Sequence, residues 1–331
     1  MTVSCILNDT GGKYAEETRK NVHETAQRLR YRPNALASGI RGGKTHVAGV
    51  MIENRDHFST EIINGIHDKL LEKQTIMFLT WNSAKHTKSW DSQAEQRTIH
   101  HLIDRRADGI ILSTSNENFD PCYFEEIWER NVPLILVDRQ IPSISTDFIG
   151  TDNAGIGAKA ARHLLELGHK RFLFCSHAHV GNSVPREKAF FETISSEPGT
   201  NCRSIDFMAV DHEDQLREVF ANPATRPTGV LCFNDWTAIE VRRFTASMGL
   251  EAPRDFSIIG CGNQHFTDSF ALNLTTFDQK PYRIGQCAAE CYLARVHSHP
   301  KQSQPQIVTI PAQLLTRGST GPVPTRSPVA G

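Results

Sequence analysis

The chain has 331 residues, of which 39% are hydrophobic and 22% charged, and its formal net charge is −1 at pH 7. This composition is ordinary for a globular protein, and the length indicates two or three domains. No apolar run approaches the ~20 residues that span a bilayer, and the first dozen residues are too polar for a secretory signal, so we expect a cytoplasmic protein without a membrane partner.

The first 45 residues are predicted to form a small basic head. They carry eight Lys/Arg and four Asp/Glu, a net of +4, so the rest of the chain carries about −5. Such a charge distribution suits contact with nucleic-acid phosphates, although +4 also falls within ordinary surface variation. Val22, Ala26 and Leu29 recur at helical spacing. The predicted elements are a helix over Ala15–Leu29, a short helix over Pro33–Ile40 and a linker over Gly42–Thr45.

From Thr45 onward, short apolar strands alternate with longer amphipathic helices, which is typical of parallel sheets covered on both faces. The number of such units favours two lobes, with a ligand in the cleft at the carboxyl ends of the strands. Predicted strands are His46–Ile52, Thr75–Trp81, Ala107–Thr114, Pro133–Asp138, Arg171–Cys175, Ser204–Met208, Gly229–Phe233 and Phe256–Gly260. Predicted helices include Ser59–Glu72, Ser89–Arg106, Ala154–Leu167, Val184–Ser196 and Asp235–Met248.

The eight cysteines predict no metal site. They are scattered, no Cys-x-x-Cys pair occurs, and Cys287 and Cys291 alone lie four apart on one predicted helix. Structural metal sites usually show paired ligands at tight spacing, so we expect buried free thiols and neither a metal nor a cofactor. The segment 318–331, rich in Pro, Gly and Ser, is predicted to be disordered.

Three runs of residues point to a family. They are Thr2-Val3-Ser4-Cys5-Ile6-Leu7-Asn8, Glu16-Glu17-Thr18-Arg19 and Leu29-Arg30-Tyr31-Arg32-Pro33-Asn34-Ala35-Leu36-Ala37. Their order resembles the lactose-repressor (LacI/GalR) family of bacterial transcription regulators, and the resemblance covers roughly residues 2–316. It implies a DNA-binding head over residues 1–32 and a hinge helix and linker over residues 33–45.

The resemblance implies that residues 2–8 end the recognition helix of a helix-turn-helix, which enters the major groove. Thr2, Ser4, Cys5 and Asn8 are then DNA contacts, with Cys5 where the family often has arginine. The first helix and the turn are missing from this pattern. Either translation begins upstream of Met1, or the protein has lost independent operator binding.

The hinge is the second DNA-binding element that the resemblance implies. In the family this helix lies in the minor groove, where an apolar side chain wedges into a base step. Ile40 takes the wedge role, and Gly39 is a departure that weakens a helix by ~1 kcal/mol relative to alanine. Alternatively, Leu36 and Ile40 pack on the effector domain. The implied contacts are Tyr31, Arg32, Asn34, Ala37, Ile40 and Arg41.

Several strand ends resemble the sugar-binding cleft of the family. Arg186 matches an arginine that holds ligand hydroxyls or a carboxylate, a role that suits its planar fork. Gly262 replaces an aspartate that binds the effector in the family, which leaves Asn263 or His265 as substitutes and makes a plain hexose less certain. The implied effector-binding residues are Phe58, Asp138, Arg186, Asn234, Asp235, Asn263 and Gln279.

Three of these residues have structural alternatives. Asp235 is equally suited to cap the helix that follows it. Asp138 is equally suited to hold the backbone between the lobes, and Phe58 to pack in the core.

The sequence therefore predicts an α/β protein with a two-lobed periplasmic-binding-protein-like effector domain, built on two parallel doubly wound sheets, behind a partial all-α head. The expected lobes are residues 46–151 plus 278–303, and residues 152–277 plus 304–317. The resemblance implies a homodimeric transcription regulator, expected to be a repressor, that binds operator DNA and a sugar-like effector. No nucleophile elbow, phosphate loop or zinc motif predicts an enzyme. The alternatives are a paralogue without DNA binding and a solute-binding protein of a transporter.

Overall fold

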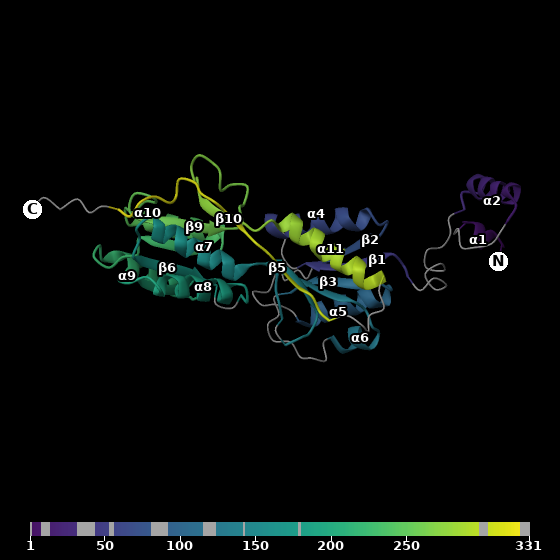
Figure 1. Ribbon diagram of the computed structural model, residues 1–331, viewed down its shortest axis with the longest axis horizontal. Coiled ribbons are helices and arrows are strands. Elements are labelled where there is room, and N and C mark those ends of the chain that lie inside the picture. Colours follow the sequence, from purple (N-terminus) through teal and green to yellow (C-terminus); the bar gives the residue numbers. More distant parts are fainter. Residues whose placement is uncertain are drawn as a thin grey trace, which may run out of the picture.

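The computed structural model describes residues 2–7, 14–31, 44–52, 56–80, 92–114, 124–141, 143–177, 180–297 and 304–324. Two helices near the N-terminus precede two α/β lobes, which lie side by side in Figure 1. Each lobe contains one six-stranded sheet. The predicted α/β class with two parallel, helix-covered sheets is confirmed.

The head contains helices α1 (Thr2–Leu7) and α2 (Glu16–Arg28). α2 agrees within one residue at each end with its predicted helix. Glu16 and Glu17 in its first turn and Arg28 in its last turn suit the helix dipole. The predicted hinge helix, and with it Asn8, Arg32, Asn34, Ala37, Ile40 and Arg41, lies outside the described residues.

The sheet of the first lobe is parallel throughout, in the order β11-β5-β4-β3-β1-β2. Both faces of this sheet are covered by helices, and successive residues of β1 pack on opposite faces because successive strand side chains point to opposite sides. Val50 and Ile52 pack under α4 and α11, whereas Met51 packs with α5 and α6. Its strands are β1 (Val47–Ile52), β2 (Ile76–Thr80), β3 (Gly109–Ser113), β4 (Leu134–Val137), β5 (Asp147–Thr151) and β11 (Ile307–Ile310). Its helices are α4 (His57–Leu71), α5 (Ser92–Asp104), α6 (Glu125–Glu129) and α11 (Pro281–His297).

The sheet of the second lobe has the order β12-β10-β9-β8-β6-β7, with β12 antiparallel to β10. Phe172, Phe174 and Phe190 fill one side of it and Phe220 and Phe256 the other. Full burial of each such side chain contributes about 1.5–3 kcal/mol. Its strands are β6 (Arg171–Ser176), β7 (Asn201–Asp206), β8 (Gly229–Cys232), β9 (Ser257–Cys261), β10 (Thr275–Asp278) and β12 (Gln313–Leu315). Its helices are α7 (Asn153–Glu166), α8 (Ser183–Ser195), α9 (His212–Ala221) and α10 (Asp235–Ser247).

The C-terminal segment differs from two predictions. Residues 304–317 were expected in the second lobe. β12 does pair with β10 of that lobe, but β11 pairs with β5 of the first sheet, with Ile307 opposite Phe148. Residues 318–324 were expected to be disordered. Instead Ser319 is buried. Its Oγ accepts a hydrogen bond from the Thr275 N–H and its carbonyl oxygen accepts one from the Ile258 N–H, so polar contacts rather than apolar burial hold this segment. Residues 325–331 lie outside the described part.

Glycines let one pair of helices in each lobe approach closely. A Cβ on Gly65 of α4 would stand 2.1 Å from the Tyr282 carbonyl oxygen of α11. In the second lobe, a Cβ on Gly157 of α7 would stand 2.0 Å from the Arg186 carbonyl oxygen of α8. Only glycine permits these separations, so Gly157 sets the position of Arg186.

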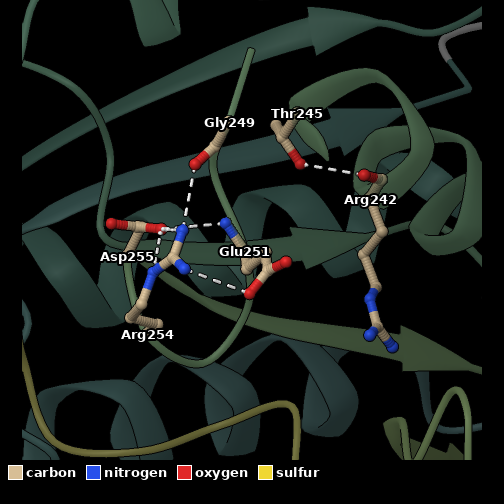
Figure 2. A network of polar contacts seen from close by, with 6 residues as sticks. All are labelled: Arg242, Thr245, Gly249, Glu251, Arg254 and Asp255. Carbon is tan, nitrogen blue, oxygen red and sulfur yellow. Dashed lines mark hydrogen bonds and ion pairs between the residues drawn. The ribbon is translucent and has the colours of Figure 1, made fainter. Parts of the chain in front are cut away.

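One arginine holds the loop between α10 and β9 (Figure 2). The Arg254 guanidinium donates to Oδ2 of Asp255 through Nε at 3.0 Å and through Nη2 at 2.8 Å. It also donates to Oε2 of Glu251 at 3.2 Å and to the Gly249 carbonyl at 2.9 Å. The loop precedes β9 and therefore lies at the amino ends of the strands, so this network supports the lobe and not the cleft.

Candidate ligand-binding cleft

A cavity of about 260 Å³ lies between the lobes at the carboxyl ends of the strands. Both lobes line it, with Phe58 of α4 on one side and Trp236 of α10 on the other. This is the position that the strand pattern predicted. Of the predicted effector-binding residues, those in the wall are Phe58, Asp138, Arg186, Asn234 and Gln279, whereas Asp235 and Asn263 are not.

Arg186 is a buried cation in this wall, with 2% of its surface exposed. Its Nη1 donates to the Phe233 carbonyl, its Nη2 donates to Oδ1 of Asn153 at 2.5 Å, and its guanidinium carbon lies 5.0 Å from the centre of the Phe233 ring. Its Nε has no hydrogen-bond partner among the described residues. A buried donor without a partner is costly, and because Nε is itself buried, an acceptor would reach it only after its neighbours move.

Asp138 links the two lobes. It follows β4 with φ 68°, and its backbone N–H donates to the Ile149 carbonyl at 2.9 Å. Its carboxylate accepts a hydrogen bond of 3.1 Å from Nδ2 of Asn182, at the start of α8 in the opposite lobe. Burial raises the pKa of this carboxyl, although Arg139 and the bond from Asn182 act in the opposite direction.

The neighbouring residues Asn234 and Asp235 have different roles, one as a helix cap and the other as the anchor of a loop. Asn234 caps α10, because its Oδ1 accepts from the Thr237 N–H at 2.8 Å. Asp235 is fully buried and accepts from the Gln264 N–H at 2.9 Å and from the Thr276 hydroxyl at 2.5 Å. Burial raises the pKa of the Asp235 carboxyl, against these two bonds. Asp235 therefore holds the loop that carries Gln264, and the residue that caps the helix is Asn234.

The segment after β9 carries Gly262 at the position where the family has an effector-binding aspartate. Gly262 lines the cavity with φ +131°, and a Cβ there would stand 3.3 Å from Oδ2 of Asp235. Asn263 points elsewhere, because its Oδ1 accepts from Nη2 of Arg317 at 2.9 Å. The His265 ring lies 5.4 Å from that of His57 in the opposite lobe, which gives a second contact between the lobes.

The sequence did not single out several wall residues. His177 follows β6, and its ring stacks on Phe233 at 4.7 Å. Its Nε2 lies 3.0 Å from Oγ1 of Thr237, and burial lowers the pKa of its imidazole. Its place at a strand end is the same signal that identified Asn234. Asn182 carries no such signal, because its role depends on the opposite lobe.

The side chains of the head differ in how exposed they are. Ile6 is buried, whereas Val3 is 54% exposed. Thr2 and Tyr31 are exposed and Cys5 is half-buried. These exposures leave Thr2 and Tyr31 accessible, and the predicted DNA contacts stay predictions.

Within the described residues, no group of three His, Cys, Asp or Glu side chains is placed to hold a metal ion. In the same residues, no helix combines the length and hydropathy required to cross a bilayer.

The fold and the cleft define a two-lobed periplasmic-binding-protein-like protein, and a family model described as a periplasmic binding protein-like domain matches residues 161–320. The chain is 26% identical over 324 residues to the helix-turn-helix-type transcriptional regulator PtxS of Pseudomonas putida, covering 97% of this chain and 92% of PtxS. It is 26% identical over 329 residues to the regulator DegA of Bacillus subtilis, covering 98% and 95%. The predicted resemblance to the LacI/GalR family is thereby confirmed over nearly the whole chain.

Solved structures share the fold. A lac repressor dimer bound to operator and the anti-inducer ONPF superposes with a TM-score of 0.76 at 20% identity, covering 97% of this chain and 94% of that one. A LacI family regulator from Enterococcus faecium with bound ribose gives a TM-score of 0.66 at 23% identity, covering 84% and 99%.

Proposed function

We propose that the protein is a DNA-binding transcription regulator of the LacI/GalR type, a repressor, controlled by a sugar-like effector bound between its lobes. The observation that carries the effector site is Arg186, a cation buried in the wall of the cavity between the lobes. The similarity to helix-turn-helix regulators over nearly the whole chain supports the DNA-binding part. The protein would act in the bacterial cytoplasm, without a cofactor and without catalysing a reaction.

The geometry supports a physical route from ligand to DNA. A ligand that contacts both lobes favours their approach, and it shifts the equilibrium only by its differential affinity for the two arrangements. The chain enters the first lobe through a clamp at Asp108. Its two carboxylate oxygens accept from the N–H groups of Thr45 and His46, both at 2.7 Å. Movement of that lobe therefore moves the segment that leads to the head.

A homodimer suits this role, because two heads related by two-fold symmetry read the two halves of a pseudo-palindromic operator. The test uses fluorescence anisotropy with labelled fragments of the promoter regions beside the coding sequence. We expect binding that weakens steeply as salt rises, since phosphate contacts release counterions. No binding to any fragment at low ionic strength would show that the protein is a paralogue without DNA binding.

The effector part is tested separately by calorimetric titration with hexoses, pentoses, disaccharides and sugar acids. Arg186→Gln should abolish binding of every hit and leave DNA binding unchanged. Arg203→Gln, which changes an exposed arginine on β7, is the matched control and should bind as the wild type does. Equal affinities of wild type and Arg186→Gln would contradict the assignment of the cleft.

A further inference from the structure

The loop that joins β9 to β10, residues 262–274, carries contacts of the second lobe on one side of the cleft. Gly262 and Gln264 line the cavity between the lobes. His265 follows them, and its ring lies 5.4 Å from the ring of His57 on α4. The loop contains neither helix nor strand, and its own backbone hydrogen bonds close turns within it. Contacts from outside the loop therefore decide where it lies.

One arginine of the C-terminal segment joins three points of this loop. Arg317 follows β12, and its Nη2 donates to Oδ1 of Asn263 at 2.9 Å. Its Nη1 donates to Oγ1 of Thr267 at 3.1 Å and to the Leu274 carbonyl at 2.9 Å. The three acceptors lie near the start, in the middle and at the end of the loop. A guanidinium suits this arrangement because its donors form a rigid planar fork.

The backbone of Arg317 is itself attached to the second sheet. Its N–H donates to Oγ1 of Thr275 at 2.9 Å, and that hydroxyl donates to the Arg317 carbonyl at 3.1 Å. Thr275 is the first residue of β10, and its N–H donates to Oγ of Ser319 at 2.8 Å. The guanidinium therefore holds the loop from a fixed support.

Arg317 reaches the cavity wall through Asn263 and the residue after it. Asn263 has a left-handed backbone with φ 49°, and the bond from Arg317 fixes its side chain. Gln264 is 6% exposed, and its N–H donates to Oδ2 of Asp235 at 2.9 Å. Arg317 and Asp235 thus hold the chain on the two sides of the bond that joins Asn263 to Gln264. Arg317 is not among the described residues that line the cavity.

We infer that Arg317 is a positioning residue of the cleft. It holds residues 262–274 in the shape that puts Gln264 in the cavity wall and His265 against the opposite lobe. Preorganisation of this kind raises affinity, because the ligand does not have to order the loop. The inference rests on the proposed effector-binding function and assigns part of the affinity to a residue outside the cavity wall.

The test is calorimetric titration of Arg317→Ala with hexoses, pentoses, disaccharides and sugar acids. We expect every sugar that the wild type binds to bind at least tenfold more weakly. Arg242→Ala is the matched control, because Arg242 on α10 is also half-buried and donates to a carbonyl of the same loop, that of Leu272. Leu272 does not line the cavity, so this variant should change the affinity less than twofold. Wild-type affinity of Arg317→Ala, or equal weakening by both variants, would overturn the inference.

Hydrogen exchange of the ligand-free proteins, followed by mass spectrometry, gives a second measurement that needs no sugar. Arg317→Ala should speed exchange over residues 262–268 at least tenfold and leave β8 unchanged, whereas Arg242→Ala should not speed exchange over residues 262–268. A uniform rise across the second lobe would show a general loss of stability and would overturn the inference.

A second variant covers misfolding of Arg317→Ala. Asn263→Gly removes the side-chain acceptor of Nη2, and glycine adopts a φ of 49° without strain. It should weaken sugar binding several-fold and speed exchange at Gln264, and wild-type behaviour of this variant would overturn the inference. A wild type that binds no sugar would overturn the proposed function, and the exchange pattern would then decide whether Arg317 positions the loop.

Discussion

Protonation of His169 should make folding strongly dependent on pH in mild acid. The side chain is 1% exposed, and its Nε2 lies 2.9 Å from Oγ of Ser257 and 3.1 Å from the Gly321 carbonyl oxygen. Burial lowers the pKa of this imidazole from 6.5 to about 4. The unfolded chain therefore takes up a proton below pH 6.5 that the folded chain refuses until about pH 4. The free energy of unfolding therefore has its full value above pH 6.5. It falls as the pH drops from 6.5 to 4, by about 3 kcal/mol in all.

The assay is urea unfolding of wild type and His169→Gln, followed by circular dichroism between pH 7.5 and 4.5. We expect the free energy of unfolding to fall by about 2 kcal/mol more in the wild type than in the variant between pH 6.5 and 5. Burial also lowers the pKa values of His163 and His177, but both remain in each protein, so the difference isolates His169. His101→Gln, an exposed control, should follow the wild type. Parallel curves for wild type and His169→Gln would refute the reasoning.

Three further substitutions test the packing around the cleft and the second lobe. Gly157→Ala places a Cβ 2.0 Å from the Arg186 carbonyl oxygen, whereas ordinary contact begins at 3.4 Å, so α8 must move. Sugar affinity measured by calorimetry should then fall at least tenfold. Unchanged affinity would contradict this. Gly262→Asp puts a carboxylate beside Asp235 at a backbone φ of +131°, so it should lower the free energy of unfolding by about 1–2 kcal/mol. It should not increase the affinity for any sugar, and an increased affinity would contradict this reasoning. Arg254→Ala should speed hydrogen exchange within its own loop. It should leave the midpoint of urea unfolding nearly unchanged, because exposed ion pairs contribute little to the free energy of unfolding. A large shift of the midpoint would refute this prediction.

Periodicity predicted the long elements of the fold well. The helix over Asp235–Met248 ends one residue earlier in the structure, at Ser247. The sequence did not reveal β5, β10, β11 or β12. β10 reads Thr-Thr-Phe-Asp, and its two threonines are fully buried in spite of their hydroxyls, so neither alternation nor an apolar run marks it. The sheet to which β11 belongs depends on Ile307 meeting Phe148, a contact between distant parts of the chain.

The cleft was predictable where a side chain follows a strand. Asp138 and Asn234 occupy such positions, and both line the cavity. The partners that define their roles were not predictable, because Asn182 reaches Asp138 from the other lobe. The separation of Asn234 and Asp235 into a cap and a loop anchor likewise depends on Gln264, which only the folded chain brings close.

The late position of α11, β11 and β12 in the chain has a consequence for biosynthesis. The first sheet lacks its edge strand until Ile310 has left the ribosome, and the second lacks its own until Leu315 has. Neither lobe is a continuous stretch. A nascent chain that stops before α11 therefore holds two sheets without their edge strands, and the first sheet also lacks a helix that covers one of its faces. Both lobes are thus completed only once residue 315 has been made, and loss of residues 281–315 would harm the two lobes together.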